Sequence, residues 1–124
     1  TYANACHEPP IVIGPNTSRW DQLLFLDEVN GSRLGQDLDS KYQETTVKIS
    51  ARSRLFFYTD GLTELTTTNG NNLGLKRMLR LVTKLNLTHS INQLPQALFE
   101  QLERFGDELA FKEDDLTYFF VEIE

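Results

Sequence analysis

One apolar segment of the sequence ends directly in an acidic residue, and this junction is the first candidate for chemistry. The run from Leu55 to Tyr58 is followed, after one threonine, by Asp60 and Gly61. A carboxylate at the end of a buried strand is held by a rigid element, and the glycine lets another group approach the backbone closely. Oxygen ligands presented in this way suit hard divalent cations such as Mg²⁺ and Mn²⁺.

A second acidic segment, residues 113–115, stands directly before the apolar run from Leu116 to Ile123. Adjacent carboxylates repel one another, and sharing a cation relieves that repulsion. If the final run pairs antiparallel with the strand that ends at Tyr58, Asp60 and Asp114 fall at the same end of one sheet. Taken singly, the first segment also reads as a plain turn and the second as a solubilising loop. The combination of the two indicates a metal site.

The elements that must position these residues follow from the spacing of apolar side chains. Short strands are predicted at residues 2–5, 11–13, 23–29, 43–49 and 55–58, and a last strand at 116–123. Two amphipathic helices are predicted where apolar residues recur at three- and four-residue intervals: Leu73, Leu75, Met78, Leu79, Val82 and Leu85, then Leu94, Leu98, Leu102 and Phe105. The last strand must pair with the earlier ones to satisfy its backbone, which predicts an α+β fold with a largely antiparallel sheet.

Composition excludes several classes of protein. The chain has 124 residues, a net charge of −6 and 40% hydrophobic residues, which suits one globular domain and disfavours nucleic acid as a partner. The single cysteine, Cys6, rules out an internal disulfide framework. No apolar run approaches the roughly 20 residues that span a bilayer, so no membrane insertion of this segment is expected. We expect a cytoplasmic location, either alone or as the cytoplasmic part of a longer, membrane-anchored sensor.

Three motifs together resemble the C-terminal half of the metal-dependent protein phosphatases of the protein phosphatase 2C superfamily, in the bacterial branch of sporulation stage II and stress-response phosphatases. They are residues 2–10 (YANACHEPP), 54–64 (RLFFYTDGLTE) and 114–117 (DDLT). The resemblance spans essentially the whole chain, and the second motif is highly specific. It implies an antiparallel β-sandwich flanked by helices and two Mn²⁺ or Mg²⁺ ions at one edge.

The resemblance also assigns site residues. Asp60 and Asp114 match metal ligands of the family, and no catalytic residue beyond the metal ligands is assigned. Asp115 and Gly61 take supporting positions beside them, and Asn4 and His7 do so in the first motif. A general-acid role for His7 and a reactive thiol at Cys6 are alternatives of less weight.

The chain departs from the family pattern in two ways. Cys6 replaces the glycine of the usual Ala-Asn-Ala-Gly-His, and the added side chain could shift that turn. The family's N-terminal half, which carries the aspartate that bridges both metals, is not in this sequence. Residues 1–124 are therefore expected to be the C-terminal part of a single phosphatase domain. As an incomplete fold, the isolated chain is expected to be inactive and to be either homo-oligomeric or strand-exchanged.

The predicted function is that of a metal-dependent phosphoserine or phosphothreonine protein phosphatase. By resemblance, the substrate is a small phosphorylated regulator such as an anti-anti-sigma factor in bacterial signalling. The alternative is a catalytically inactive relative that acts as a regulatory or protein-binding module. The residues that precede Thr1 in a longer protein would separate these two hypotheses, because they would hold or lack the bridging aspartate.

Overall fold

The computed structural model describes residues 1–67, 69–105 and 115–124. Along the chain the strands are β1 (Ile11–Ile13), β2 (Leu24–Phe25), β3 (Arg54–Tyr58) and β4 (Tyr118–Glu122). The helices are a 3-10 turn η1 (Trp20–Gln22), the short α1 (Asp60–Glu64), α2 (Gly74–Asn86) and α3 (Leu94–Phe105). In this part of the chain, no helix is long and apolar enough to cross a membrane.

The four strands form one antiparallel sheet in the order β2-β1-β3-β4. The longest pairing joins β3 to β4, with Arg54 opposite Glu122 at one end and Tyr58 opposite Tyr118 at the other. The last strand thus pairs with the most apolar strand of the chain, as its backbone requires. The predicted α+β class with an antiparallel sheet is confirmed.

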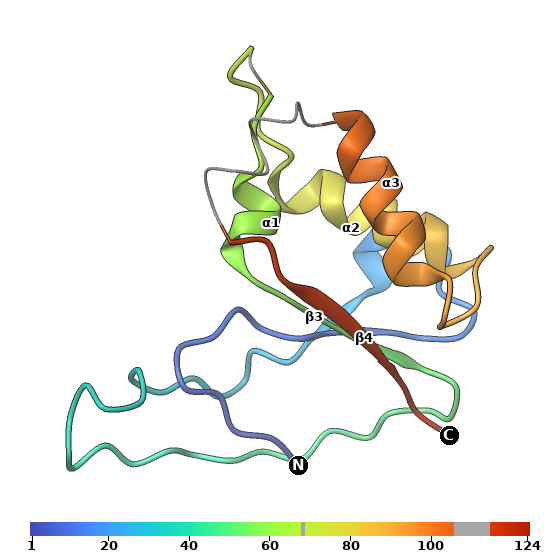
Figure 1. Ribbon diagram of the computed structural model, residues 1–124. Coiled ribbons are helices and arrows are strands. Elements are labelled where there is room, and N and C mark those ends of the chain that lie inside the picture. Colours follow the sequence, from blue (N-terminus) through green and yellow to red (C-terminus); the bar gives the residue numbers. More distant parts are fainter. Residues whose placement is uncertain (68, 106–114) are drawn as a thin grey trace.

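The helices cover one face of this sheet (Figure 1). Alternate residues of β3 point toward them: Phe56 is fully buried, and its ring stacks on Phe120 of β4 with centroids 4.7 Å apart. The helices contribute leucines, a valine and a methionine at the predicted spacing, which join the same buried cluster: Met78, Leu79, Val82 and Leu85 of α2, and Leu94, Leu98 and Leu102 of α3. Burial of each such side chain stabilises the fold by about 1.5–3 kcal/mol.

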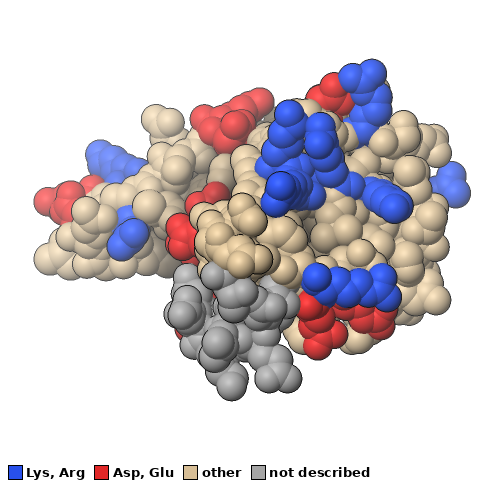
Figure 2. Space-filling model, turned by 90° about the horizontal axis from the view of Figure 1, so that it is seen from above, with Lys and Arg blue, Asp and Glu red and all other residues tan. Residues whose placement is uncertain are grey.

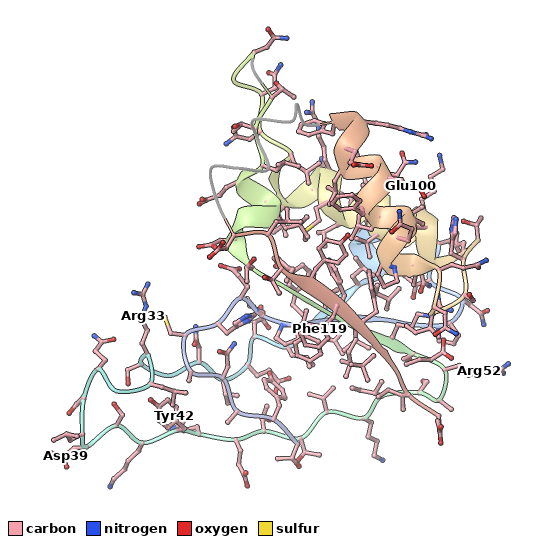
Figure 3. All side chains as sticks on the ribbon, viewed as in Figure 1. Arg33, Asp39, Tyr42, Arg52, Glu100 and Phe119 are labelled. Carbon is pink, nitrogen blue, oxygen red and sulfur yellow. The ribbon has the colours of Figure 1, made fainter. Side chains whose placement is uncertain are left out.

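The opposite face of the sheet is apolar but only partly covered. Phe57 and Phe119 stack there with centroids 4.7 Å apart, and Phe119 keeps 50% of its surface exposed. Phe119 points away from the helices, toward the extended segment that runs beneath the sheet (Figure 3). Between that segment and the sheet lies a cavity of about 610 Å³, lined mainly by apolar residues such as Leu26, Val47 and Leu55.

Two predicted strands are wrong, and one of them falls in the extended segment beneath the sheet. Where strands were expected at residues 2–5 and 43–49, the structure has a single bridge between Tyr2 and Thr45. A strand must have a partner along its length, and Tyr2 reaches only one residue of the other segment. The run predicted at 23–29 is a strand only at Leu24 and Phe25. Helix α1 was not predicted at all, since its five residues are too few to show a helical period.

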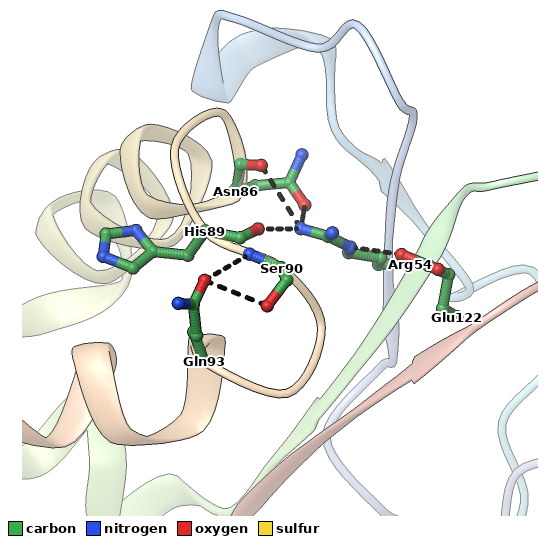
Figure 4. A network of polar contacts seen from close by, with 6 residues as sticks. All are labelled: Arg54, Asn86, His89, Ser90, Gln93 and Glu122. Atoms are coloured by element: carbon green, nitrogen blue, oxygen red, sulfur yellow. Dashed lines mark hydrogen bonds and ion pairs between the residues drawn. The ribbon is translucent and has the colours of Figure 1, made fainter.

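Arg54, the first residue of β3, connects the sheet to the helical layer (Figure 4). The Nε of Arg54 donates to Glu122 of β4 at 2.8 Å, and its Nη1 donates to the backbone carbonyls of Asn86 and His89. The same Nη1 also donates to the Asn86 side chain at 2.9 Å. Arg54 therefore pairs with a carboxylate across the sheet and satisfies carbonyl groups at the end of α2.

Replacing Arg54 by methionine should lower the free energy of unfolding by about 1–3 kcal/mol, because it leaves these part-buried acceptors without a donor. Arg19→Met is the matched control, since Arg19 pairs with Asp21 on an exposed surface and its loss should leave stability unchanged. Urea unfolding of the three proteins measures both effects. Equal stability of the Arg54 and Arg19 variants would contradict the role given to Arg54.

Candidate functional site

Asp60 lies where the sheet ends and the first helix begins. It follows β3 by two residues and is the first residue of α1, with an exposed side chain. Its Oδ1 accepts a hydrogen bond from the backbone N–H of Gly61 at 3.0 Å. Gly61 itself is buried against the core. A carboxylate in the first turn of a helix is favoured by the N–H groups exposed there.

Asp115 lies at the same end of the sheet as Asp60. Because β4 runs antiparallel to β3, the residues before β4 return beside the residues after β3. The pairing continues beyond both strands, since the N–H of Thr59 donates to the carbonyl of Thr117 at 3.0 Å. The structure thus brings Asp60 and Asp115 to one edge. Asp114, the second predicted ligand, falls outside the described residues.

Asn4 and His7 form a tight turn. The carboxamide of Asn4 accepts from the His7 N–H at 2.8 Å and donates to the His7 carbonyl at 2.9 Å. Asn4 is buried, whereas the His7 side chain is exposed and its Nδ1 lies 2.8 Å from the carbonyl oxygen of Glu8. A carbonyl can only accept, so Nδ1 carries the hydrogen in this contact. The supporting roles predicted for Asn4 and His7 remain predictions.

Cys6 occupies this turn in the conformation that glycine favours. Its φ is +63°, in the left-handed region, and its N–H donates to Asn30 Oδ1 at 3.1 Å. The side chain is exposed, so the added Cβ and Sγ point into solvent rather than into the turn. The cysteine therefore keeps a turn of the kind a glycine would make, at the cost of a strained backbone.

The cavity beneath the sheet reaches this same edge. Asn4 and His7 line it, as do Thr59 and Thr117 at the ends of the paired strands. Tyr58 lines it too, and burial, together with the negative charge of Glu8, raises the pKa of its phenol to about 12. The Tyr58 phenol therefore stays protonated at physiological pH.

Several basic side chains gather on one face of the molecule. Helix α2 carries four exposed basic residues, and Figure 2 shows Lys and Arg side chains gathered on the face seen from above. Two of them, Lys76 and Arg80, lie over the ring of Trp20, at 5.2 and 5.6 Å from its centroid. These two contacts help to hold η1 against α2 and give Lys76 and Arg80 a structural role.

Asp60 and Asp115 together form the acidic edge of the sheet, and their oxygen atoms suit a hard cation. Asp60 and Asp115 are both exposed and offer oxygen ligands, and Mg²⁺ is often bound by one or two carboxylates with waters retained. Within the described part of the chain, no group of three or more His, Cys, Asp or Glu residues surrounds one point. The described residues thus fit one side of a Mg²⁺ or Mn²⁺ site and do not enclose one.

Sequence reasoning gave no role to the threonines that flank the acidic residues. Thr59 and Thr117 are opposite one another just beyond the paired strands. Both belong to the quoted motifs, yet a threonine next to an aspartate carries no signal by residue type alone. Only the pairing of β3 with β4 shows that they meet.

Two solved structures share this fold. The SiaA-PP2C domain of Pseudomonas aeruginosa superposes with a TM-score of 0.69 at 14% identity, over 94% of this chain and 43% of that one. The structure of the RsbU and RsbW domains of Rv1364c from Mycobacterium tuberculosis gives 0.67 at 20% identity, over 99% of this chain and 32% of that one. This chain therefore spans less than half the length of either structure. No curated protein gives a significant match.

The likeness to the SiaA-PP2C domain and to the RsbU and RsbW structure gives this chain a PP2C-like fold. The family model of stage II sporulation protein E (SpoIIE) matches residues 1–124, and the chain belongs to that family. The resemblance seen in the sequence motifs is thereby confirmed.

The left-handed turn makes residue 6 a test of local strain. Cys6→Gly should raise the free energy of unfolding by about 0.5–1 kcal/mol, because relief of the left-handed penalty exceeds the added entropy of an unfolded glycine. Cys6→Ala keeps a Cβ and should bring no gain. Thermal or urea unfolding of both variants checks this, and a destabilised glycine variant would show that the turn gains more from the cysteine than it loses.

Proposed function

We propose that residues 1–124 supply the C-terminal part of a metal-dependent phosphoserine or phosphothreonine protein phosphatase domain. The observation that carries the proposal is the return of Asp115 beside Asp60 at one end of the β3–β4 pair. In this proposal the substrate is a small phosphorylated regulator, such as an anti-anti-sigma factor, and the setting is the bacterial cytoplasm. Cys6, the single cysteine, calls for no oxidising compartment.

Asp60 and Asp114 are the residues proposed to hold Mn²⁺ or Mg²⁺, with Asp115 and Gly61 supporting them. Once bound, such ions neutralise charge on phosphoryl oxygens and lower the pKa of a water molecule. The chain's own contribution is to present the Asp60 carboxylate from the end of β3, whose position is fixed by pairing with β1 and β4 on its two sides. Gly61, which follows Asp60, has no side chain that would keep a group from the backbone there.

The exposed face of the sheet supports the proposal that this chain is one part of a domain. Leu55, Phe57 and Phe119 form an apolar surface away from the helices, above a cavity of about 610 Å³. A domain of this kind buries its apolar sheet faces on both sides. We therefore propose that the remainder of the phosphatase domain packs here and brings further metal ligands to the acidic edge.

This proposal predicts that the 124-residue chain alone shows no appreciable Mn²⁺-dependent hydrolysis of a phosphoserine peptide. A longer protein that contains this chain should be active. Asp60→Asn should lower that activity by more than the 10- to 100-fold that is typical when a residue orienting a metal ligand is lost. Asp21→Asn is the matched control, because Asp21 is an exposed aspartate paired with Arg19. Release of phosphate with and without Mn²⁺ measures all of these.

Each contrary outcome has a distinct meaning. Turnover by the isolated chain that is lost in Asp60→Ala would show that the 124 residues form a complete centre. An unaffected Asp60→Asn variant of the longer protein would remove Asp60 from the metal site. A longer protein that binds a phosphorylated partner but does not hydrolyse it would favour the inactive binding module.

The isolated chain is also predicted to associate, because its apolar sheet face is only partly covered. Light scattering at micromolar concentration should give a mass above 14.3 kDa. Phe119→Asp, which places a charge on that face, should shift the chain toward monomer, whereas Leu87→Asp, an equally exposed leucine on the helical side, should not. A stable wild-type monomer with cooperative unfolding would limit the incompleteness to the metal site.

A further inference from the structure

The hydroxyl of Thr59 connects the two acidic segments in a way that the backbone alone does not. Thr59 stands opposite Thr117, and its N–H donates to the Thr117 carbonyl at 3.0 Å. In a regular antiparallel pair of this type, the second bond would run from the Thr117 N–H to the Thr59 carbonyl. Instead, the Thr117 N–H donates to Thr59 Oγ1 at 3.1 Å.

The backbone carbonyl of Thr59 is used elsewhere. It accepts from the N–H of Leu62 at 3.1 Å and so closes the first turn of α1. A carbonyl that has turned toward the helix cannot also face the neighbouring strand, so the side chain supplies the acceptor in its place. This explains why Thr59 precedes α1 without its hydroxyl capping that helix.

The same hydroxyl also reaches the acidic segment before β4. Thr59 Oγ1 lies 3.2 Å from the carbonyl oxygen of Asp115 and 3.3 Å from that of Thr117, and its one hydrogen can be donated to either. Thr59 therefore fixes the backbone of Asp115 while its own backbone leads directly into Asp60. At Thr59 the chain passes from β3 into α1, and the Thr59 hydroxyl keeps the neighbouring residue Thr117 hydrogen-bonded.

We propose that Thr59 is a positioning residue for the acidic edge: its hydroxyl sets the backbone separation between Asp60 and the segment at Asp115, and thereby the affinity for a divalent cation. This inference rests on the proposed function, since it assigns a purpose to the same edge. Loss of a group that orients metal ligands without touching the metal lowers metal affinity by about 10- to 100-fold.

The test compares Thr59→Val, which keeps the shape without the hydroxyl, with Thr59→Ser, which keeps the hydroxyl. Both are made in the longer active protein. Thr83→Val is the matched control, because Thr83 is buried in α2 and its hydroxyl donates to Leu79 at 2.7 Å, within the helix. The readouts are Mn²⁺ binding by calorimetry and hydrogen exchange of the Thr117 amide.

Thr59→Val should bind Mn²⁺ about tenfold more weakly and exchange the Thr117 amide faster. Thr59→Ser should match the wild type in both, and Thr83→Val should lose stability but keep its Mn²⁺ affinity. Faster exchange with unchanged Mn²⁺ affinity would overturn the positioning role and leave a purely structural contact. Unchanged exchange would refute the bond itself.

The two levels of the proposal fail in different ways. If the wild-type protein binds no Mn²⁺, the proposed phosphatase function fails and the positioning role falls with it, while the exchange measurement still decides whether the hydroxyl holds Thr117. If the wild type binds Mn²⁺ and Thr59→Val binds it equally well, only the role of Thr59 is overturned.

Discussion

The pairing of β3 with β4 is the interaction on which the acidic edge of this molecule depends. These strands come from distant parts of the sequence, and their five residue pairs include three aromatic ones. Two of those pairs stack, Phe56 on Phe120 toward the helices and Phe57 on Phe119 on the other face. Stacked aromatic pairs between neighbouring strands stabilise the pairing in addition to the backbone hydrogen bonds, and here they do so on both faces of the sheet.

The two faces of the sheet are both apolar, but they are covered to different extents. Toward the helices, aromatic rings meet leucines of α2 and α3, and the side chains are fully packed. On the other face a thin extended segment, tied to the N-terminal residues at Tyr2 and Thr45, leaves a cavity. Aromatic residues thus lie on both faces of the sheet, and the proposal that a further part of the domain packs on the second face accounts for those that face away from the helices.

The sequence predicted best those elements whose pattern is long and local. Helices α2 and α3 follow from apolar spacing, and β3 and β4 from runs of aromatic and aliphatic residues. The strands predicted at residues 2–5 and 43–49 were wrong because alternation shows that a segment can be a strand, not that a partner exists. Asp60 was singled out by its place after a strand, whereas Thr59 needed the cross-strand geometry to be noticed. The predicted ligand Asp114 stays a prediction.

The contacts at the two ends of β3 have a consequence for how the strand can move. Arg54 holds one end to Glu122 and to the turn after α2, and Thr59 holds the other end to Thr117. A shift of register by one residue would move the strand about 3.3 Å and exchange its two faces, which would break both ends at once. Small sliding displacements are therefore not available to this pair. The offset between Asp60 and Asp115 along the strand direction can therefore change only in steps of a whole residue, with loss of the native pairing, whereas Thr59 sets the separation across the strands.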